Sequence, residues 1–181
     1  IKSSHVTYGI DNKADLKVTN YSLHINYSQI EFLYKKNIYN AKTNLIGKFN
    51  IYNCISAILC CLEIGLDFDK IKNALLNFES VPGRIEKFNL INDNIAIVDY
   101  AHTPDAYQNI LSTIKEICVN RKIITVFGCG GNRDKSKRSL MAKISEQYSQ
   151  HIYVTTDNPR NEDEDNIIND ILTGFDSTNH T

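Results

Sequence analysis

The feature that most constrains this fold is an alternation, in the second half of the chain, between short apolar runs and segments with helical periodicity. Apolar runs occupy residues 95–100, 122–127 and 152–155, and a helix-like segment follows each of them. The first such segment begins at Thr103-Pro104, the second spans residues 136–148, and the third is announced by Asn161 as its N-cap. This repeated order predicts a parallel, doubly wound sheet with right-handed crossovers. The run at 122–127 is nearly continuous, which predicts that both sheet faces are covered.

The first part of the chain has a different pattern. Residues 1 to about 46 alternate polar and apolar side chains, which predicts a small antiparallel sheet. Two helices are expected next, one that Gly65 terminates and one that Asp67 caps, and Asn50 and Asn53 are candidate caps of the first. Val81-Pro82-Gly83 breaks the second helix. The predicted class is α/β, with a small antiparallel sheet and two helices before the doubly wound part.

Composition narrows the class of partner. The 181 residues carry a formal net charge of −1, which argues against binding of nucleic acid or of an anionic membrane surface. No apolar run reaches the length of a membrane span, so membrane insertion is not expected. Five cysteines without a Cys-x-x-Cys pair predict neither a disulfide framework nor a zinc site, and they favour a cytoplasmic setting. Because the chain starts at Ile1 rather than Met, we expect it to be an excerpt of a longer protein.

Three polar motifs follow the three apolar runs: Asp99 to His102, Gly128 to Arg133, and Asp157 to Arg160. In doubly wound sheets, ligands bind beyond the carboxyl ends of the strands. The positions of these motifs therefore predict a ligand site built from them.

The glycine-rich motif lies between a predicted strand and a predicted helix. Its glycines permit a tight turn and close approach of a ligand to backbone N–H groups. Arg133 occupies the place of the third glycine of a dinucleotide fingerprint, which excludes that cofactor. A guanidinium beside a helix N-terminus suits a carboxylate or a phosphate. The alternative is a purely structural turn.

The turn Asp157-Asn158-Pro159-Arg160 joins a buried strand to a capped helix. Pro159 stiffens it and holds Asn158 extended. Asp157 and Arg160 can then face one small zwitterion, the carboxylate meeting an ammonium and the guanidinium a carboxylate. The alternative is a turn whose charges are solvated.

Three other residues give weaker signals. Asp99 suits a ribose hydroxyl or, with His102, a metal ion. Asn53 fits an ordinary helix cap, and Arg84 fits either a hinge or a surface charge.

The order of these segments resembles the Mur ligase family. The matching stretches are GKFNIYN (47–53), VPGRIE (81–86), VDYAHTPDA (98–106), FGCGGNRD (127–134) and TDNPR (156–160). The resemblance runs from about residue 6 to the end and is densest between residues 47 and 174.

The resemblance implies an ATP-dependent ligase of cell-wall peptidoglycan synthesis. Such an enzyme transfers a phosphoryl group from ATP to the glutamyl carboxylate of a UDP-N-acetylmuramoyl dipeptide, and the amine of meso-2,6-diaminopimelate then attacks the acyl phosphate. Residues 1–84 would end the central ATPase domain, and residues 85–181 would form most of a Rossmann-like C-terminal domain. ATP and Mg²⁺ would be bound mainly by parts outside this chain, which has no phosphate-binding loop. The 181 residues alone are therefore expected to hydrolyse no ATP.

Carried over residue by residue, the resemblance assigns diaminopimelate to Arg133, Asp157, Asn158, Pro159 and Arg160. It assigns ATP to Asn53, Arg84 and Asp99, and it supplies no catalytic residue or metal ligand within this chain. The alternatives left open are a lysine-adding ligase of the same family and a non-catalytic remnant. A folate ligase is disfavoured by the segments around Asp99 and Asp157. Three departures from the family pattern, Asn132, Ser136 and Ser139, surround Arg133.

Overall fold

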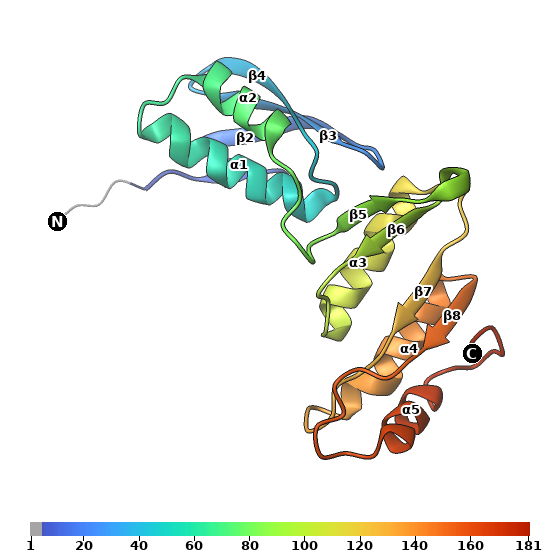
Figure 1. Ribbon diagram of the computed structural model, residues 1–181. Coiled ribbons are helices and arrows are strands. Elements are labelled where there is room, and N and C mark those ends of the chain that lie inside the picture. The colour runs from blue at the N-terminus through green and yellow to red at the C-terminus, as the bar shows by residue number, and fades with distance from the viewer. Residues whose placement is uncertain (1–4) are drawn as a thin grey trace. The chain divides into compact units, whose positions relative to one another are not determined.

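The computed structural model describes residues 5–181, which divide into two compact units (Figure 1). Unit 1 ends at Asp99, and unit 2 covers Tyr100–Thr181. The predicted domain boundary between residues 84 and 85 lies inside unit 1 and stays a prediction about the longer protein.

Unit 1 contains a four-stranded sheet in the order β1-β2-β3-β4. Its strands are β1 (Tyr8–Gly9), β2 (Leu16–Leu23), β3 (Ser28–Tyr34) and β4 (Asn37–Thr43). The three long strands pair antiparallel, as predicted, and β1 adds a short parallel edge. Alternate residues of β3 are buried, so one face of the sheet belongs to a core and the other faces solvent.

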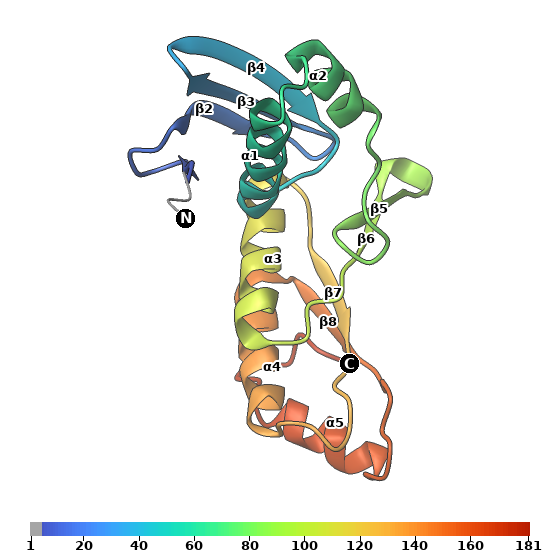
Figure 2. The ribbon, with the colours of Figure 1, turned by 90° about the vertical axis from the view of Figure 1, so that its left-hand side faces the viewer.

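Helices α1 (Lys48–Glu63) and α2 (Phe68–Asn77) lie on the buried face of this sheet (Figures 1 and 2). Asp67 caps α2 as predicted, because its carboxylate accepts hydrogen bonds from the backbone of Asp69 and Lys70. Helix α1 begins after Gly47, so Asn50 and Asn53 lie inside the helix and the expectation that they cap it is wrong. The core of unit 1 is formed by fully buried side chains of the sheet and α1, among them Leu16, Ile30, Phe32, Ile51, Ile55 and Ile58.

Unit 1 ends in a hairpin. Strand β5 (Glu86–Asn89) pairs antiparallel with β6 (Ile95–Val98), and the short 3₁₀ helix η1 (Ile91–Asp93) forms the connection. The first of the predicted parallel strands, β6, is therefore joined to an antiparallel neighbour.

Unit 2 has the predicted strand–helix alternation. Its elements are α3 (Pro104–Ile117), β7 (Ile124–Phe127), α4 (Ser136–Tyr148), β8 (His151–Val154) and α5 (Glu164–Leu172). Strands β7 and β8 are parallel, and the backbone of residues 179–181 hydrogen-bonds along the other edge of β8. Helices α3 and α4 pack against each other, and Thr103 caps α3 as predicted. The core joins all three helices to the strands through Leu111, Phe127, Met141, Ala142, Ile152, Ile167 and Ile171.

Two expectations about unit 2 are wrong. Helix α5 is capped by Asp163, whose carboxylate accepts from Asn166 N, while Asn161 N donates to Asn132 Oδ1 instead. The expectation that both faces of the strand at 122–127 are covered is also wrong. The helices of unit 2 pack on one face of β7, and on the opposite face Ile124 and Val126 are 61% and 65% exposed in the described part of the chain. Over residues 5–181, no helix combines the length and the apolar character needed to cross a membrane.

Candidate functional site

The two loops predicted to bind a small ligand leave the same edge of the sheet. Strand β7 ends at Phe127 and β8 at Val154, and the strands are parallel and in register. The loop of residues 128–135, called the glycine loop below, therefore begins next to the loop of residues 155–163, called the DNPR loop. The structure brings together two of the three predicted motifs. The third motif crosses from one unit to the other: Asp99 ends unit 1, and Tyr100 to His102 begin unit 2, where His102 O accepts a hydrogen bond from Lys137 Nζ of α4 at 2.8 Å.

Hydrogen bonds join the two loops directly. Gly131 N donates to Asn158 O at 2.9 Å, and Asn161 N donates to Asn132 Oδ1 at 3.0 Å. The guanidinium of Arg160 donates through Nη1 to Gly131 O at 2.7 Å. This pairing explains why residue 131 must be glycine, since a β-carbon there would lie 2.6 Å from the carbonyl carbon of Pro159.

The DNPR loop holds Arg160 in an unusual backbone conformation. Its φ is +51°, in the left-handed region, and its N–H donates to Asn158 Oδ1 at 3.2 Å. Such a conformation costs about 1 kcal/mol or more in a residue with a β-carbon and persists only where neighbours fix it. Here the side chain of Asn158 and the bond to Gly131 fix it. The side chain of Arg160 is exposed, so its other N–H groups are accessible to a ligand.

The remaining predicted residues of this site lie around the same two loops. Arg133 is exposed at the tip of the glycine loop and follows Asn132, whose φ is +52°. Asp157 is exposed, and Pro159 is half-buried. Both border a crevice that Ile167 and Ile168 of α5 also line and that is too narrow to admit a water molecule.

Two residues that the sequence analysis missed hold this arrangement. Glu162 accepts a hydrogen bond from Asn132 N at 2.5 Å and pairs with Arg138 at 3.0 Å and with Lys135 at 3.2 Å. The hydrogen bond from Asn132 and the two cations lower the pKa of the Glu162 carboxyl. Arg138 is 0% exposed. Its signal in the sequence is its spacing, because it shares one stripe of α4 with Met141, Ala142 and Ser145.

Burial opposes the charge on Arg138, but its hydrogen bonds to Asp170 and Glu162 outweigh burial and raise the pKa of the guanidinium. Both carboxylates accept from its Nη1 atom, at 2.8 Å for Asp170 and 3.0 Å for Glu162. Arg138 is therefore a permanent cation that links α4 to the DNPR loop and to α5.

The three residues predicted to bind the nucleotide all lie in unit 1. Ile85 N donates to Asp99 Oδ2 at 2.8 Å, so the carboxylate of Asp99 lies beside Arg84 at the open end of the β5–β6 hairpin. Asn53 lies on α1, where its amide donates to Asn50 Oδ1 at 3.1 Å. The structure thus fixes the Asp99 carboxylate at the backbone of the residue that follows Arg84. Asn53 contacts its own helix.

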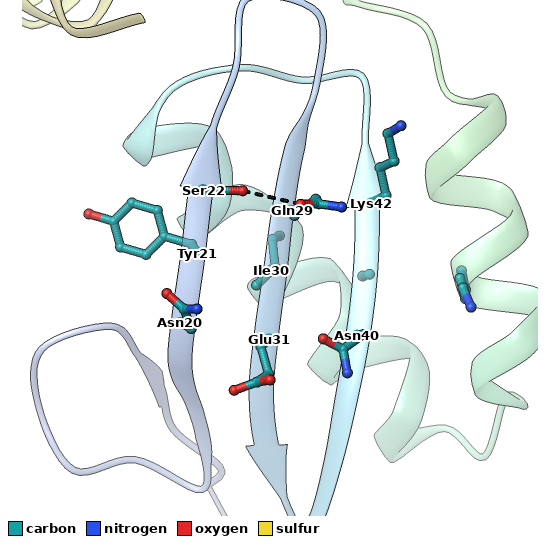
Figure 3. Close-up of a pocket in the computed structure, with 10 residues that line it drawn as sticks. Asn20, Tyr21, Ser22, Gln29, Ile30, Glu31, Asn40 and Lys42 are labelled. Carbon is teal, nitrogen blue, oxygen red and sulfur yellow. Dashed lines mark hydrogen bonds between the residues drawn. The ribbon is translucent and has the colours of Figure 1, made fainter.

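A separate polar hollow of about 330 Å³ lies over β2, β3 and β4 in unit 1 (Figure 3). Ser22 Oγ donates to Gln29 Oε1 across it at 3.3 Å, and Glu31 and Asn40 lie further along the strands. None of the residues that line it is a predicted site residue. Along the described part of the chain, no group of three acidic, His or Cys side chains could hold a metal ion.

Two family models match the chain. The Mur ligase middle domain matches residues 1–61, and the Mur ligase glutamate ligase domain matches residues 83–181.

Curated relatives are similar over nearly the whole chain. The UDP-N-acetylmuramoyl-L-alanyl-D-glutamate–2,6-diaminopimelate ligase of Clostridium botulinum is 41% identical over 179 residues, which cover 97% of this chain and 36% of that enzyme. The enzyme of the same name from Aquifex aeolicus is 44% identical over 170 residues, which cover 94% of this chain and 34% of that enzyme. This chain therefore spans about a third of the length of the relatives it matches.

Solved structures agree with these matches. A UDP-N-acetylmuramoyl-L-alanyl-D-glutamate–2,6-diaminopimelate ligase superposes with a TM-score of 0.67 at 31% identity, over 94% of this chain and 35% of that one. Folylpolyglutamate synthase from Thermotoga maritima superposes with a TM-score of 0.73 at 21% identity, over 92% of this chain and 39% of that one. The second likeness concerns the fold alone.

Proposed function

The chain belongs to the Mur ligase family, and from that premise we propose that it forms the amino-acid-binding part of an ATP-dependent, amide-forming ligase. The proposed amino acid is meso-2,6-diaminopimelate, and the proposed acceptor is UDP-N-acetylmuramoyl-L-alanyl-D-glutamate. The observation that carries this proposal is the pairing of the glycine loop with the DNPR loop, which gathers Arg133, Asp157 and Arg160 at one edge of the sheet. The names of relatives 41% and 44% identical to the chain support the choice of substrate.

The proposed reaction explains why ATP is required. A free carboxylate is a poor electrophile, so the γ-phosphoryl group of ATP is first transferred to the glutamyl carboxylate of the dipeptide. The amine of diaminopimelate attacks the resulting acyl phosphate, the C–N bond forms, and inorganic phosphate leaves as the amine loses a proton. The residues of unit 2 would hold the attacking amino acid in place, which lowers the entropic part of the barrier.

The loop residues match the charges of diaminopimelate at its end away from the new bond. That end carries an ammonium and a carboxylate, whereas lysine carries no carboxylate there. We assign the carboxylate to Arg160, with Arg133 beside it, and the ammonium to Asp157. Asn158 and Pro159 give the turn its shape. One charged hydrogen bond of this kind contributes about 1.5–3 kcal/mol, which corresponds to a preference over lysine of roughly ten- to a hundredfold.

For the nucleotide we propose Asn53, Arg84 and Asp99, with the Asp99 carboxylate directed to the ribose. The hydrogen bond from Ile85 N fixes that carboxylate beside Arg84, which supports the assignment of these two residues. ATP would bring Mg²⁺, to which we assign no ligand among residues 5–181. A cytoplasmic location is part of the proposal, because ATP is consumed and the five cysteines are free thiols.

The test is an amino-acid selectivity assay on the full-length protein. With ATP and the UDP-linked dipeptide, we expect amide formation with meso-diaminopimelate at a kcat/KM at least tenfold above that with L-lysine, measured by mass spectrometry of the product. Equal use of lysine would identify a lysine-adding ligase instead. Absence of turnover that depends on any amino acid would favour a non-catalytic remnant.

Arg160→Ala gives the sharper measurement. We expect this substitution to raise KM for diaminopimelate about ten- to a hundredfold and to leave KM for ATP within about twofold. Asp99→Asn serves as the matched control, since it should raise KM for ATP and leave KM for diaminopimelate unchanged. Equal losses for both substrates in the Arg160 variant would show that Arg160 has a structural role.

A further inference from the structure

Arg138 is the largest fully buried side chain of the described residues. Arginine is almost never buried completely unless it is paired, because removing its charge from water costs several kcal/mol. The four hydrogen bonds of Arg138 run in three directions: to Asp170 on α5, to Glu162 in the DNPR loop and to Gly130 O in the glycine loop. Two of these partners, Glu162 and Gly130, belong to the loops of the proposed ligand site.

Glu162 connects Arg138 to both ligand-binding arginines. One of its carboxylate oxygens accepts hydrogen bonds from both Nη atoms of Arg138 at 3.0 Å. The other accepts a hydrogen bond from the backbone N–H of Asn132 at 2.5 Å. Asn132 immediately precedes Arg133, and Glu162 follows Arg160 by two residues. A shift of the Glu162 carboxylate would therefore move both arginines.

The backbone at these positions depends on the surrounding contacts. Asn132 and Arg160 have φ values of +52° and +51°, and both would relax toward ordinary conformations if their neighbours released them. The bond from Asn132 N to Glu162 is one such contact, and Arg138 holds Glu162 in place. The side chain of Glu162 is only 15% exposed, so water replaces these partners poorly.

Asp170, the other carboxylate partner of Arg138, allows an effect on stability to be distinguished from an effect on the position of the two arginines. Asp170 accepts a hydrogen bond from Nη1 at 2.8 Å and ties α4 to α5, and within the described residues its side chain makes no hydrogen bond to either loop. Loss of Asp170 should loosen the helix pair and leave the Arg138–Glu162 contact in place.

From this geometry we infer that Arg138, acting through Glu162, is a positioning residue that directs Arg133 and Arg160 at the amino-acid substrate. The inference rests on the proposed function and deepens it, because it makes selectivity depend on a residue that does not touch the ligand.

The test compares four variants of the full-length protein with wild type: Arg138→Lys, Glu162→Gln, Asp170→Asn and Lys135→Gln. KM for diaminopimelate, KM for ATP, kcat and the melting temperature are measured for each. Arg138→Lys keeps the positive charge and removes the paired Nη donors that reach Glu162 and Gly130. Glu162→Gln keeps the shape and loses the charge. Lys135→Gln removes the exposed partner of the same carboxylate, whose side chain is 65% exposed.

We expect Arg138→Lys and Glu162→Gln each to raise KM for diaminopimelate about tenfold, with KM for ATP within about twofold of wild type. Asp170→Asn and Lys135→Gln should leave both KM values within about twofold, even where Asp170→Asn lowers the melting temperature as much as Arg138→Lys does. The double variant of Arg138 and Glu162 should be no worse in KM than the more affected single variant, because both act through one contact.

The inference is overturned if KM for diaminopimelate rises in all variants in proportion to the loss of melting temperature. It is also overturned if Glu162→Gln, the variant more certain to fold, binds diaminopimelate as wild type does. Failure of the proposed function is a different result, since the wild-type protein would then show no turnover that depends on diaminopimelate.

Discussion

Gly131 is the position where one added methyl group should separate the glycine loop from the DNPR loop. In Gly131→Ala the β-carbon would lie 2.6 Å from the carbonyl carbon of Pro159 and closer still to its oxygen. The obstacle is backbone, so no rotation of a side chain relieves the overlap. Either the loops move apart, or they stay together under strain.

Each route has a cost that the structure allows us to estimate. Separation breaks the bond from Gly131 N to Asn158 O and the bond from Arg160 to Gly131 O, which together contribute about 2 kcal/mol at about 1 kcal/mol each. Retaining both bonds places an extra methyl group in a filled space, which costs typically about 1–3 kcal/mol. The variant takes the cheaper route, so we expect a loss of about 2 kcal/mol in the free energy of unfolding of unit 2.

Gly130→Ala is the matched control. A β-carbon at residue 130 meets Arg160 Nη1 at 2.8 Å, the far end of a flexible side chain, and the φ of Gly130 lies outside the left-handed region. We expect this variant to displace the Arg160 guanidinium and to lose its bond to Gly131 O, a cost of about 1 kcal/mol and so about half the loss expected for Gly131→Ala. Urea denaturation followed by hydrogen exchange of peptides from α4 and α5 measures both variants. Equal losses at the two positions would refute the argument from backbone contact.

Three further predictions concern local features. Asp67→Ala removes the cap of α2, in which Asp67 Oδ1 accepts from Asp69 N at 2.9 Å, and should lower the stability of unit 1 by about 1 kcal/mol in urea denaturation. Lys36→Gly should raise that stability by about 0.5 kcal/mol, because Lys36 has a φ of +69° in the two-residue β3–β4 turn, and an unchanged denaturation midpoint would contradict this reasoning. The pKa of Glu162 is lowered below its ordinary value of 4.5, so its contribution to stability is complete above that pH and is lost as the pH falls through the lowered pKa. The difference in melting temperature between wild type and Glu162→Gln should therefore shrink between pH 7 and pH 3, and a constant difference would show that the charge of Glu162 contributes nothing.

Most of the fold follows from periodicity in the sequence. The alternation in residues 28–34 marks β3, and the helical spacing of Ile55, Ile58 and Leu59 marks α1, because each pattern reports one buried face. The α/β class was predicted on this basis and is confirmed, as is the resemblance to the Mur ligase family. The cap of α5 was misplaced because Asn161 and Asp163 are both good caps by composition. A contact between Asn161 and Asn132 across the two loops decides between them.

The candidate site was predictable only where the topology determines it. Parallel strands place the glycine loop and the DNPR loop at one edge, so the proximity of Arg133 to Arg160 follows from the order of elements. Strand β6 pairs antiparallel with β5, a pairing that the apolar run at residues 95–100 does not indicate. The role of Arg138 was missed because arginine is exposed by default, and its burial depends on two carboxylates 24 and 32 residues away.

The contacts between the loops also bear on how selectivity arises. Arg160 already donates to Gly131 O through Nη1, so part of its hydrogen-bonding capacity orients the guanidinium before any ligand is present. Ordering a free arginine on binding costs roughly 0.5–1.5 kcal/mol, and that cost is met here during folding. A preference for a second carboxylate then depends on the fixed geometry of the guanidinium as well as on its charge. On the proposed assignment of Arg160 to the substrate carboxylate, Arg138 and Glu162 would determine selectivity without touching the ligand, because they hold the backbone from which the guanidinium projects.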